Sequence, residues 1–206
     1  MSTYRTFIAI ELPAHIRQDI KQLIDRLHQA FPDVRASWNR EDNLHLTLKF
    51  LGEVSVSLIP TLSKACAKAA RQLEPFELVV KGCGIFPPHG RPKVLWVGVQ
   101  GEEPDSASSS VATSDASPLM LLHASIEDAA AAAGFAREPR RYHPHLTIAR
   151  LRESRDARAL AEQHRLIGFP PHAFTVTELV VFRSELSSKG AKHTALSRHG
   201  LGCSES

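Results

Sequence analysis

The sequence His45-Leu46-Thr47-Leu48 recurs as His145-Leu146-Thr147-Ile148, 100 positions later. Both copies read His-x-Thr-x with apolar residues at the x positions, and both lie in segments where apolar and polar side chains alternate. Such alternation predicts a β-strand, in which residues i and i+2 point to the same face. Each copy therefore places an imidazole beside a hydroxyl, while the apolar residues anchor the opposite face in a core.

Two such strands, brought together, would present two imidazoles and two hydroxyls to one ligand. A tetrahedral oxyanion such as a phosphate fits this set, because imidazole titrates near neutral pH and hydroxyls donate hydrogen bonds to anionic oxygens. Two unrelated strands with solvent-facing His and Thr residues would contain the same letters. The matched apolar positions favour a shared site over two unrelated strands. We therefore predict one site, built from His45, Thr47, His145 and Thr147.

The bulk composition is that of a soluble globular protein. The chain has 206 residues, with 43% hydrophobic and 23% charged residues, which suits one compact unit or two small lobes sharing a core. The net charge of +3 is too small to identify a nucleic-acid-binding protein by itself. No apolar run is long enough for a membrane-spanning helix, and the N-terminus lacks the layout of a signal peptide. We expect no membrane association.

The cysteines indicate the compartment. Cys66, Cys83 and Cys203 lack metal-ligand spacing, and any disulfide would leave one of them unpaired. Three reduced thiols in a cytoplasmic protein are the simplest interpretation.

Hydrophobic periodicity predicts a mixed order of elements. In chain order these are a strand at 4–12, a helix at 13–31, a short strand at 34–38, the first motif strand to 54, a helix at 57–72, strands at 76–85 and 93–100, a helix at 118–133, the second motif strand, a helix at 154–164, and strands at 174–186 and 192–198. Each half contains a motif strand followed by a helix. We therefore predict one α+β domain over residues 1–206, with two pseudo-symmetric lobes, each an antiparallel-rich sheet with helices on its outer face, around a central cleft.

Residues 101–117 interrupt this pattern. The tract is rich in Ser, Ala, Glu and Asp and has no apolar periodicity that could form a core. We predict a flexible low-complexity insertion between a strand and a helix.

The paired motifs resemble those of the two-histidine phosphoesterase superfamily. Within it, the chain is similar to the bacterial and archaeal RNA 2′,3′-cyclic phosphodiesterases, historically called 2′-5′ RNA ligases. The similarity extends beyond the motifs to most of the chain, except residues 101–117 and the last few. It includes the stretches RTFIAI at 5–10, HLTLKFLG at 45–52, GIFP at 84–87, PKVLWVG at 92–98 and RSEL at 183–186, and the arginine Arg150 that follows the second motif.

The resemblance implies an α+β architecture with a central cleft and a metal-independent reaction on an RNA or oligonucleotide with a 2′,3′-cyclic phosphate end. It implies His45 as the proton donor, His145 as the proton acceptor and a 2′-phosphate as the product. The pseudo-symmetry of the motifs leaves the two proton-transfer roles interchangeable on the residues alone. Thr47 and Thr147 would donate hydrogen bonds to the phosphate. We expect no metal or other cofactor, and a monomer.

Further substrate contacts follow from position. His143 lies two residues before His145 and would share its face, with a structural role as the alternative. Arg150 lies an odd number of positions after His145, so a regular strand would point it away unless a bulge redirects it. Phe7 and Phe86 are candidates for stacking on the terminal base, although Phe7 also fits a core position. Five basic residues could line the rim of the cleft and bind RNA phosphates: Lys49, Arg91, Lys93, Arg140 and Arg141.

Three alternatives use the same residues. In a metal-dependent hydrolase, His143 and His145 would be ligands, but no carboxylate or cysteine stands at an obvious partner spacing. A module that only binds RNA ends or nucleotides would have no need of a matched acid and base. Ligation through a 2′-5′ linkage shares the site and is separated from hydrolysis by its product.

Overall fold

The computed structural model describes residues 2–101, 117–152, 155–187 and 190–202. Its elements in chain order are β1 (Thr3–Glu11), α1 (Ala14–Ala30), β2 (Ala36–Trp38), η1 (Glu41–Asn43), β3 (His45–Ser55), η2 (Val56–Leu58), α2 (Ile59–Ala70), β4 (Phe76–Phe86), β5 (Val94–Gly101), α3 (Pro118–Ala132), β6 (His145–Leu151), α4 (Ala157–Ile167), β7 (His172–Val176), β8 (Glu178–Ser187) and β9 (Gly190–Gly200).

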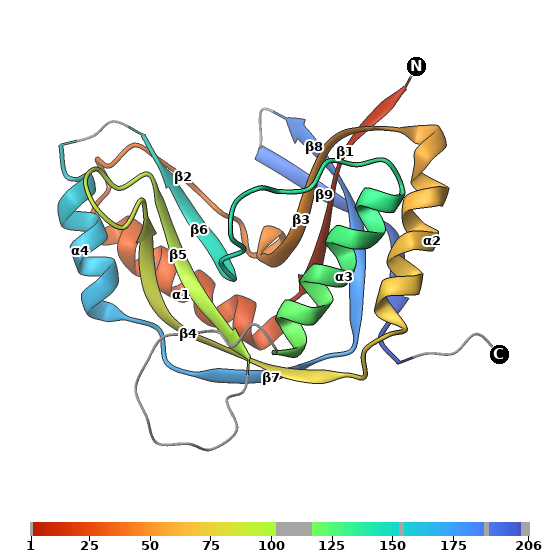
Figure 1. Ribbon diagram of the computed structural model, residues 1–206. Helices are drawn as coiled ribbons and strands as arrows, with labels where there is room; N and C mark the ends of the chain where they lie inside the picture. Colours follow the sequence, from red (N-terminus) through yellow and green to blue (C-terminus); the bar gives the residue numbers. More distant parts are fainter. Residues whose placement is uncertain (1, 102–116, 153–154, 188–189, 203–206) are drawn as a thin grey trace.

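The strands form two antiparallel sheets (Figure 1). One has the order β3-β1-β8-β9 and the other β2-β6-β5-β4-β7. Helices α2 and α3 pack on the first sheet, whereas α4 packs on β4 of the second and contacts α1. The predicted α+β fold with two similar lobes is confirmed, and each motif strand belongs to a different sheet.

The apolar residues of both motifs are buried as predicted. Leu46, Leu146 and Ile148 are fully buried and Leu48 is 3% exposed, and all four belong to one hydrophobic core that extends through both lobes. Helix α1 adds an apolar stripe to the same core, made of Ile16, Ile20, Leu23, Ile24 and Leu27. The burial of apolar side chains on one face of each motif strand leaves the histidine face for chemistry.

The prediction of one strand over residues 174–186 is wrong. Strand β7 ends at Val176 and pairs with β4, while β8 begins at Glu178 and pairs with β1 and β9 of the other sheet. Thr177 is thus the point where the chain crosses between the lobes. Apolar residues continue on both sides of it, so the sequence pattern contains no sign of the change of sheet.

The other elements differ from prediction mainly at their ends. Helix α4 begins at Ala157 instead of 154 and ends before Gly168, whose φ of 66° is one that glycine adopts without strain. Strand β9 includes the predicted strand at 192–198 and lies at a sheet edge. Cys66 is buried and Cys83 is half-buried, and both are free thiols, whereas Cys203 lies outside the described residues.

The predicted insertion at 101–117 lies outside the described residues except at its ends. Gly101 closes β5, and Ser117 caps α3 by accepting a hydrogen bond from the Met120 amide. In the described part of the chain, no helix is both long enough and apolar enough to cross a membrane.

Candidate active site

Strand register places His45 and Thr47 on one face of β3. His45 lies opposite Glu11 and Thr47 opposite Ala9 on β1, and paired residues of antiparallel strands point to the same side. The register then shifts between Thr47 and Lys49, so that Phe50 lies opposite Phe7. We call the side of this sheet that carries His45, Thr47 and Phe50 the His45 face.

Strand β6 repeats this arrangement. His145 lies opposite Gly98 and Thr147 opposite Trp96 on β5, and a register shift follows before Ala149. Arg150 then lies opposite Val94, two residues from Trp96, so it returns to the face of His145 and Thr147. A regular strand would point Arg150 to the opposite face, and the bulge at the register shift turns it back toward the face of His145. We call this side of the five-stranded sheet the His145 face.

Both histidines make the same hydrogen bond. Nδ1 of His45 lies 2.7 Å from the carbonyl oxygen of Asn43, and Nδ1 of His145 lies 2.7 Å from the carbonyl oxygen of His143. A carbonyl oxygen only accepts, so Nδ1 carries the hydrogen in each ring. The neutral imidazoles therefore keep Nε2 as a proton acceptor, and the protonated ones keep Nε2–H as a donor.

The ring of His45 packs against aromatic side chains from other strands of the same sheet. The Phe7 ring stacks on His45 with centroids 4.7 Å apart, and Phe7 itself is only 3% exposed. His193, from β9, meets the His45 ring edge-on at 5.3 Å and the Phe7 ring at 4.9 Å. Phe7 belongs to a small buried cluster with Ala9, Val180 and Phe182, which supports the His45 face from within.

His145 is held in a similar way by residues from the hairpin. Phe86 meets its ring edge-on at 4.9 Å, and the exposed His143 lies 5.3 Å from Phe86 and 6.4 Å from His145. The Trp96 ring lies across Gly84, where a Cβ atom would come within 2.0 Å of it. Glycine at position 84 therefore allows the indole to lie flat against β4, 5.5 Å from His143.

The environment of each histidine favours its neutral form. Burial, together with the nearby His193, lowers the pKa of His45 to about 4, although the Asn43 hydrogen bond and Glu11 act in the opposite direction. Burial also lowers the pKa of His145; its hydrogen bond to His143 opposes this, and the charges of His143 and Arg150 add to it. Both rings are therefore neutral near pH 7 when no anion is bound.

Two reciprocal hydrogen bonds join the motifs. The Tyr142 hydroxyl donates to the carbonyl oxygen of Thr47 at 3.0 Å, and the Asn39 side-chain amide donates to the carbonyl oxygen of Thr147 at 2.7 Å. Each donor comes from the segment that precedes the other motif. Strands β3 and β6 are in contact near the middle of the molecule (Figure 1). The structure therefore brings the two predicted motifs together.

A buried ion pair joins β3 to α3. Lys49 donates to Glu127 of α3 at 2.7 Å and to the carbonyl oxygen of Ala136, and Glu127 also accepts from the Glu138 amide. The Lys49 and Glu127 side chains are 3% and 9% exposed. The prediction that Lys49 binds RNA phosphates is therefore wrong, because the bulge after Thr47 turns its side chain into the core.

The sequence matches the family described as LigT like Phosphoesterase over residues 10–96 and 111–193. The chain belongs to the LigT-like phosphoesterase family. It is 31% identical to the RNA 2′,3′-cyclic phosphodiesterase of Methanothermobacter thermautotrophicus, over 92% of this chain and 95% of the relative. The identity to the Escherichia coli protein of the same name is also 31%, over 96% of each. The resemblance inferred from the paired motifs is confirmed.

A solved structure supports the same assignment. The crystal structure of E. coli LigT complexed with 3′-AMP superposes with a TM-score of 0.70 at 27% identity, covering 97% of this chain and 99% of that one. The LigT-like fold therefore extends over both lobes.

The remaining predicted contacts of this LigT-like chain fall at different places. His143, Phe86 and Arg150 lie around His145, as described above. Lys93 is exposed, and its backbone bonds to Phe86 and Leu151 place it at the end of the same sheet. Arg140 is exposed and pairs with Glu138, and Arg91 and Arg141 are also exposed. Phe7 is only 3% exposed, and its ring contacts those of His45, Phe182 and His193, which fits the core position that the sequence also allowed.

Sequence patterns missed His193, Asn39 and Tyr142. His193 lies in a strand with few apolar residues, and no spacing relates it to either motif. Among the described residues, no group of three or more His, Cys, Asp or Glu side chains is arranged to hold a metal ion.

Proposed function

We propose that this LigT-like phosphoesterase hydrolyses RNA 2′,3′-cyclic phosphate ends to 2′-phosphates by metal-independent acid–base catalysis. The observation that carries the proposal is the duplicated geometry of His45 and His145. Each ring has Nδ1 bonded to the carbonyl oxygen two residues upstream, and each has a threonine of its own motif on the same face. The names of the relatives support the substrate class.

The chemistry requires two proton transfers on opposite sides of phosphorus. In the proposed step, Nε2 of His145 accepts a proton from a water molecule whose oxygen attacks phosphorus. The bond from phosphorus to the ribose 3′ oxygen breaks, and Nε2–H of His45 protonates that oxygen. The product is a 2′-phosphate with a free 3′-hydroxyl, and one water molecule is consumed. Two imidazoles with opposite protonation states suit this reaction.

The remaining residues would stabilise negative charge. Thr47 and Thr147 would donate hydrogen bonds to the non-bridging oxygens, and Arg150 would add a positive charge on the side of His145. Binding of the anionic phosphate would raise the pKa of both histidines, and His45 would then take up from solvent the proton that it lacks in the free protein near pH 7.

The direct test is a short RNA with a 2′,3′-cyclic end, incubated with the protein and EDTA, followed by determination of the position of the terminal phosphate. We expect a 2′-phosphate. His45→Ala and His145→Ala should each reduce turnover about 10²–10⁴-fold, since each removes one proton-transfer group. Thr47→Val and Thr147→Val keep the shape and should reduce turnover by less. Dependence on a divalent metal, or a 2′-5′ ligated product alone, would contradict the proposal.

A further inference from the structure

Phe50 occupies the place on β3 that Arg150 occupies on β6. Each residue follows its motif threonine across one register shift, and each returns to the face that carries the motif histidine. The two lobes thus put different chemistry at equivalent positions. Arg150 presents a cation on the His145 face, whereas Phe50 presents an aromatic ring that is 53% exposed on the His45 face.

An exposed phenylalanine at this place is unusual for the sheet around it. The neighbouring aromatic residues of the His45 face, Phe7 and Phe182, are only 3% and 6% exposed and are packed together. Phe50 lies directly opposite Phe7 across the β1–β3 ladder, and the Phe7 ring in turn stacks on His45. The exposed ring of Phe50 therefore lies on the same face as His45. The Phe7 ring, which contacts His45, is the cross-strand partner of Phe50.

Arg5 accompanies this ring. Its guanidinium carbon lies 4.9 Å from the centroid of Phe50, in the geometry of a cation–π contact. Its cross-strand neighbour Glu53 instead accepts a hydrogen bond from the Thr3 hydroxyl at 2.8 Å. Within the described residues, no carboxylate forms an ion pair with Arg5. The exposed guanidinium thus stays available to an anionic ligand.

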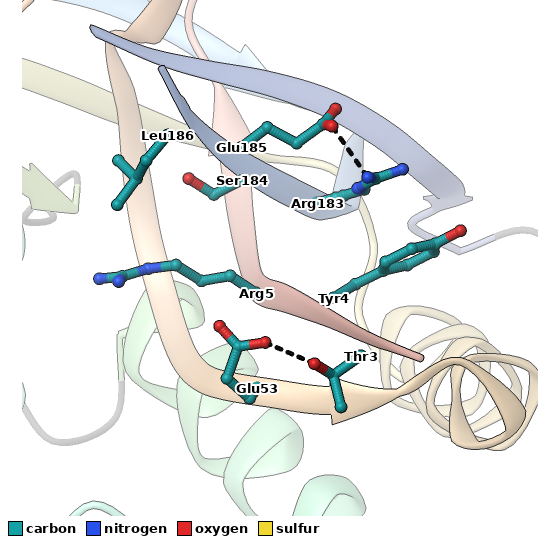
Figure 2. Close-up of a pocket in the computed structure, with 8 residues that line it drawn as sticks. All are labelled: Thr3, Tyr4, Arg5, Glu53, Arg183, Ser184, Glu185 and Leu186. Atoms are coloured by element: carbon teal, nitrogen blue, oxygen red, sulfur yellow. Dashed lines mark hydrogen bonds and ion pairs between the residues drawn. The ribbon is translucent and has the colours of Figure 1, made fainter. Parts of the chain in front are cut away.

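Over the part of the chain that the structure describes, a nearby arginine, Arg183, does have an ion-pair partner, unlike Arg5. Arg183 lies over the Tyr4 ring at 4.1 Å and is ion-paired with Glu185 at 2.8 Å. Figure 2 shows that the Arg5 side chain extends away from this pair, at the rim of a pocket of about 250 Å³ at this end of the sheet. The exposed Leu186 also lines the pocket. The pocket is also lined by Glu53 and Glu185, but within the described residues neither is ion-paired with Arg5. Space, an apolar surface and an arginine without an ion-pair partner among those residues therefore occur together beyond Phe50.

We propose that Phe50 and Arg5 form a second nucleotide subsite, which holds the nucleotide on the 5′ side of the cyclic phosphate end. The base of that nucleotide stacks on the open face of Phe50, and its phosphodiester lies against the Arg5 guanidinium. This inference rests on the proposed function of the histidine pair. It extends that function from a phosphate-binding site to a site that recognises a single-stranded RNA chain.

The chemistry favours this occupant over a protein segment. Single-stranded nucleic acids are bound by aromatic rings that stack on bases and by cations that follow the backbone, without a need for sequence-specific hydrogen bonds. Phe50 and Arg5 provide one of each, on the face of the sheet that leads from His45. An apolar peptide would make no use of the guanidinium.

The test compares two substrates, a nucleoside 2′,3′-cyclic monophosphate and a dinucleotide that ends in the same 2′,3′-cyclic nucleotide. Phe50→Ala should lower kcat/KM for the dinucleotide about 5- to 150-fold, the range of one base–aromatic stack, and leave the mononucleotide within about twofold. Phe50→Tyr keeps the ring face and should retain the preference for the dinucleotide. Leu166→Ala is the matched control, because Leu166 is 76% exposed on α4 and outside both faces.

Arg5→Met tests the phosphate contact. It should weaken the dependence of log KM on log salt for the dinucleotide by about 0.7, the value for one phosphate contact to a single strand, and leave the mononucleotide unchanged. If Phe50→Ala affects both substrates equally, or neither, the second subsite is refuted. If the wild-type protein hydrolyses neither substrate, the result contradicts the proposed function itself and not the subsite alone. The two failures are therefore distinguishable.

Discussion

The Tyr142 hydroxyl donates a hydrogen bond to the carbonyl oxygen of Thr47, and so the segment before the second motif holds the backbone of the first. The Tyr142 ring is itself fixed, because it stacks on His123 with centroids 4.0 Å apart and an interplanar angle of 8°. Asn39 makes the reciprocal bond to Thr147. Two side-chain-to-backbone hydrogen bonds therefore tie the strand of His45 to the strand of His145.

Tyr142→Phe should consequently reduce kcat more than it raises KM. The substitution keeps the ring stacked on His123 and removes one hydrogen bond, which costs about 0.5–1.5 kcal/mol of stability. A small loosening of the motifs slows a reaction that depends on alignment of two groups. Steady-state kinetics and thermal denaturation of the same variant check both effects. Unchanged kcat with lowered stability would show that the bond is structural only.

The buried pair Lys49–Glu127 makes a sharper prediction about stability. Lys49→Met leaves the Glu127 carboxylate buried without its cation, which should destabilise the fold by about 3–5 kcal/mol. The double variant Lys49→Met, Glu127→Gln removes both charges and keeps an acceptor for the Glu138 amide, so most of that stability should return. Denaturant unfolding of the two variants measures the difference. Equal loss in both would mean that the pair is not coupled.

Much of the site could be predicted because it depends on local pattern. The duplication of His-x-Thr identifies His45 and His145, and strand alternation places each threonine beside its histidine. The side on which Arg150 and Lys49 lie could not be predicted, because each motif strand contains a bulge that reverses the alternation. No residue type at the bulge distinguishes it from a regular strand.

His193 could not be predicted for a different reason. It lies on β9, which is separated from β3 by two strands in the order of the sheet, and yet its ring contacts that of His45. The Asn43 side chain also reaches β9, where it donates to the carbonyl oxygen of Ala191. The sheet therefore curves enough for its two edges to approach each other beside His45, and such curvature is a property of the whole sheet.

Deletion of residues 104–116 should leave both fold and activity largely intact. Gly101 and Ser117 lie side by side, since a Cβ atom at Gly101 would be 3.4 Å from the Cβ of Ser117. The two residues that remain between them are enough to connect neighbouring positions, as in a two-residue turn. The melting temperature and the turnover of the shortened protein are the measurements. A large decrease in either would show that the removed tract contributes to packing or to substrate binding.

The pH dependence of the wild-type protein follows from the two lowered pKa values. In the proposed mechanism the reactive form of the free protein has one histidine neutral and the other protonated, and this form is most populated between their pKa values. Because the pKa of His45 is about 4 and that of His145 is also lowered, kcat/KM should be maximal below the ordinary imidazole pKa of about 6.5. Bound phosphate raises both, so the kcat profile should lie at higher pH when chemistry limits the rate. Coincident profiles, or activity that is flat from about pH 5 to 9, would contradict the acid–base account.

Single variants then assign the two roles. In His45→Ala the remaining pH dependence belongs to His145, and a base is active when it is neutral, so residual activity should rise with pH to a plateau. In His145→Ala the remaining group is the proposed acid, which is active when protonated, and residual activity should decrease as pH rises through its pKa. Residual rates of both variants over the same buffers provide the comparison. If the two profiles are exchanged, His145 is the proton donor and His45 the acceptor. The equal hydrogen bonds at Nδ1 allow either order, and the unequal surroundings, with Glu11 and His193 near His45 and Arg150 near His145, are what distinguish the two rings.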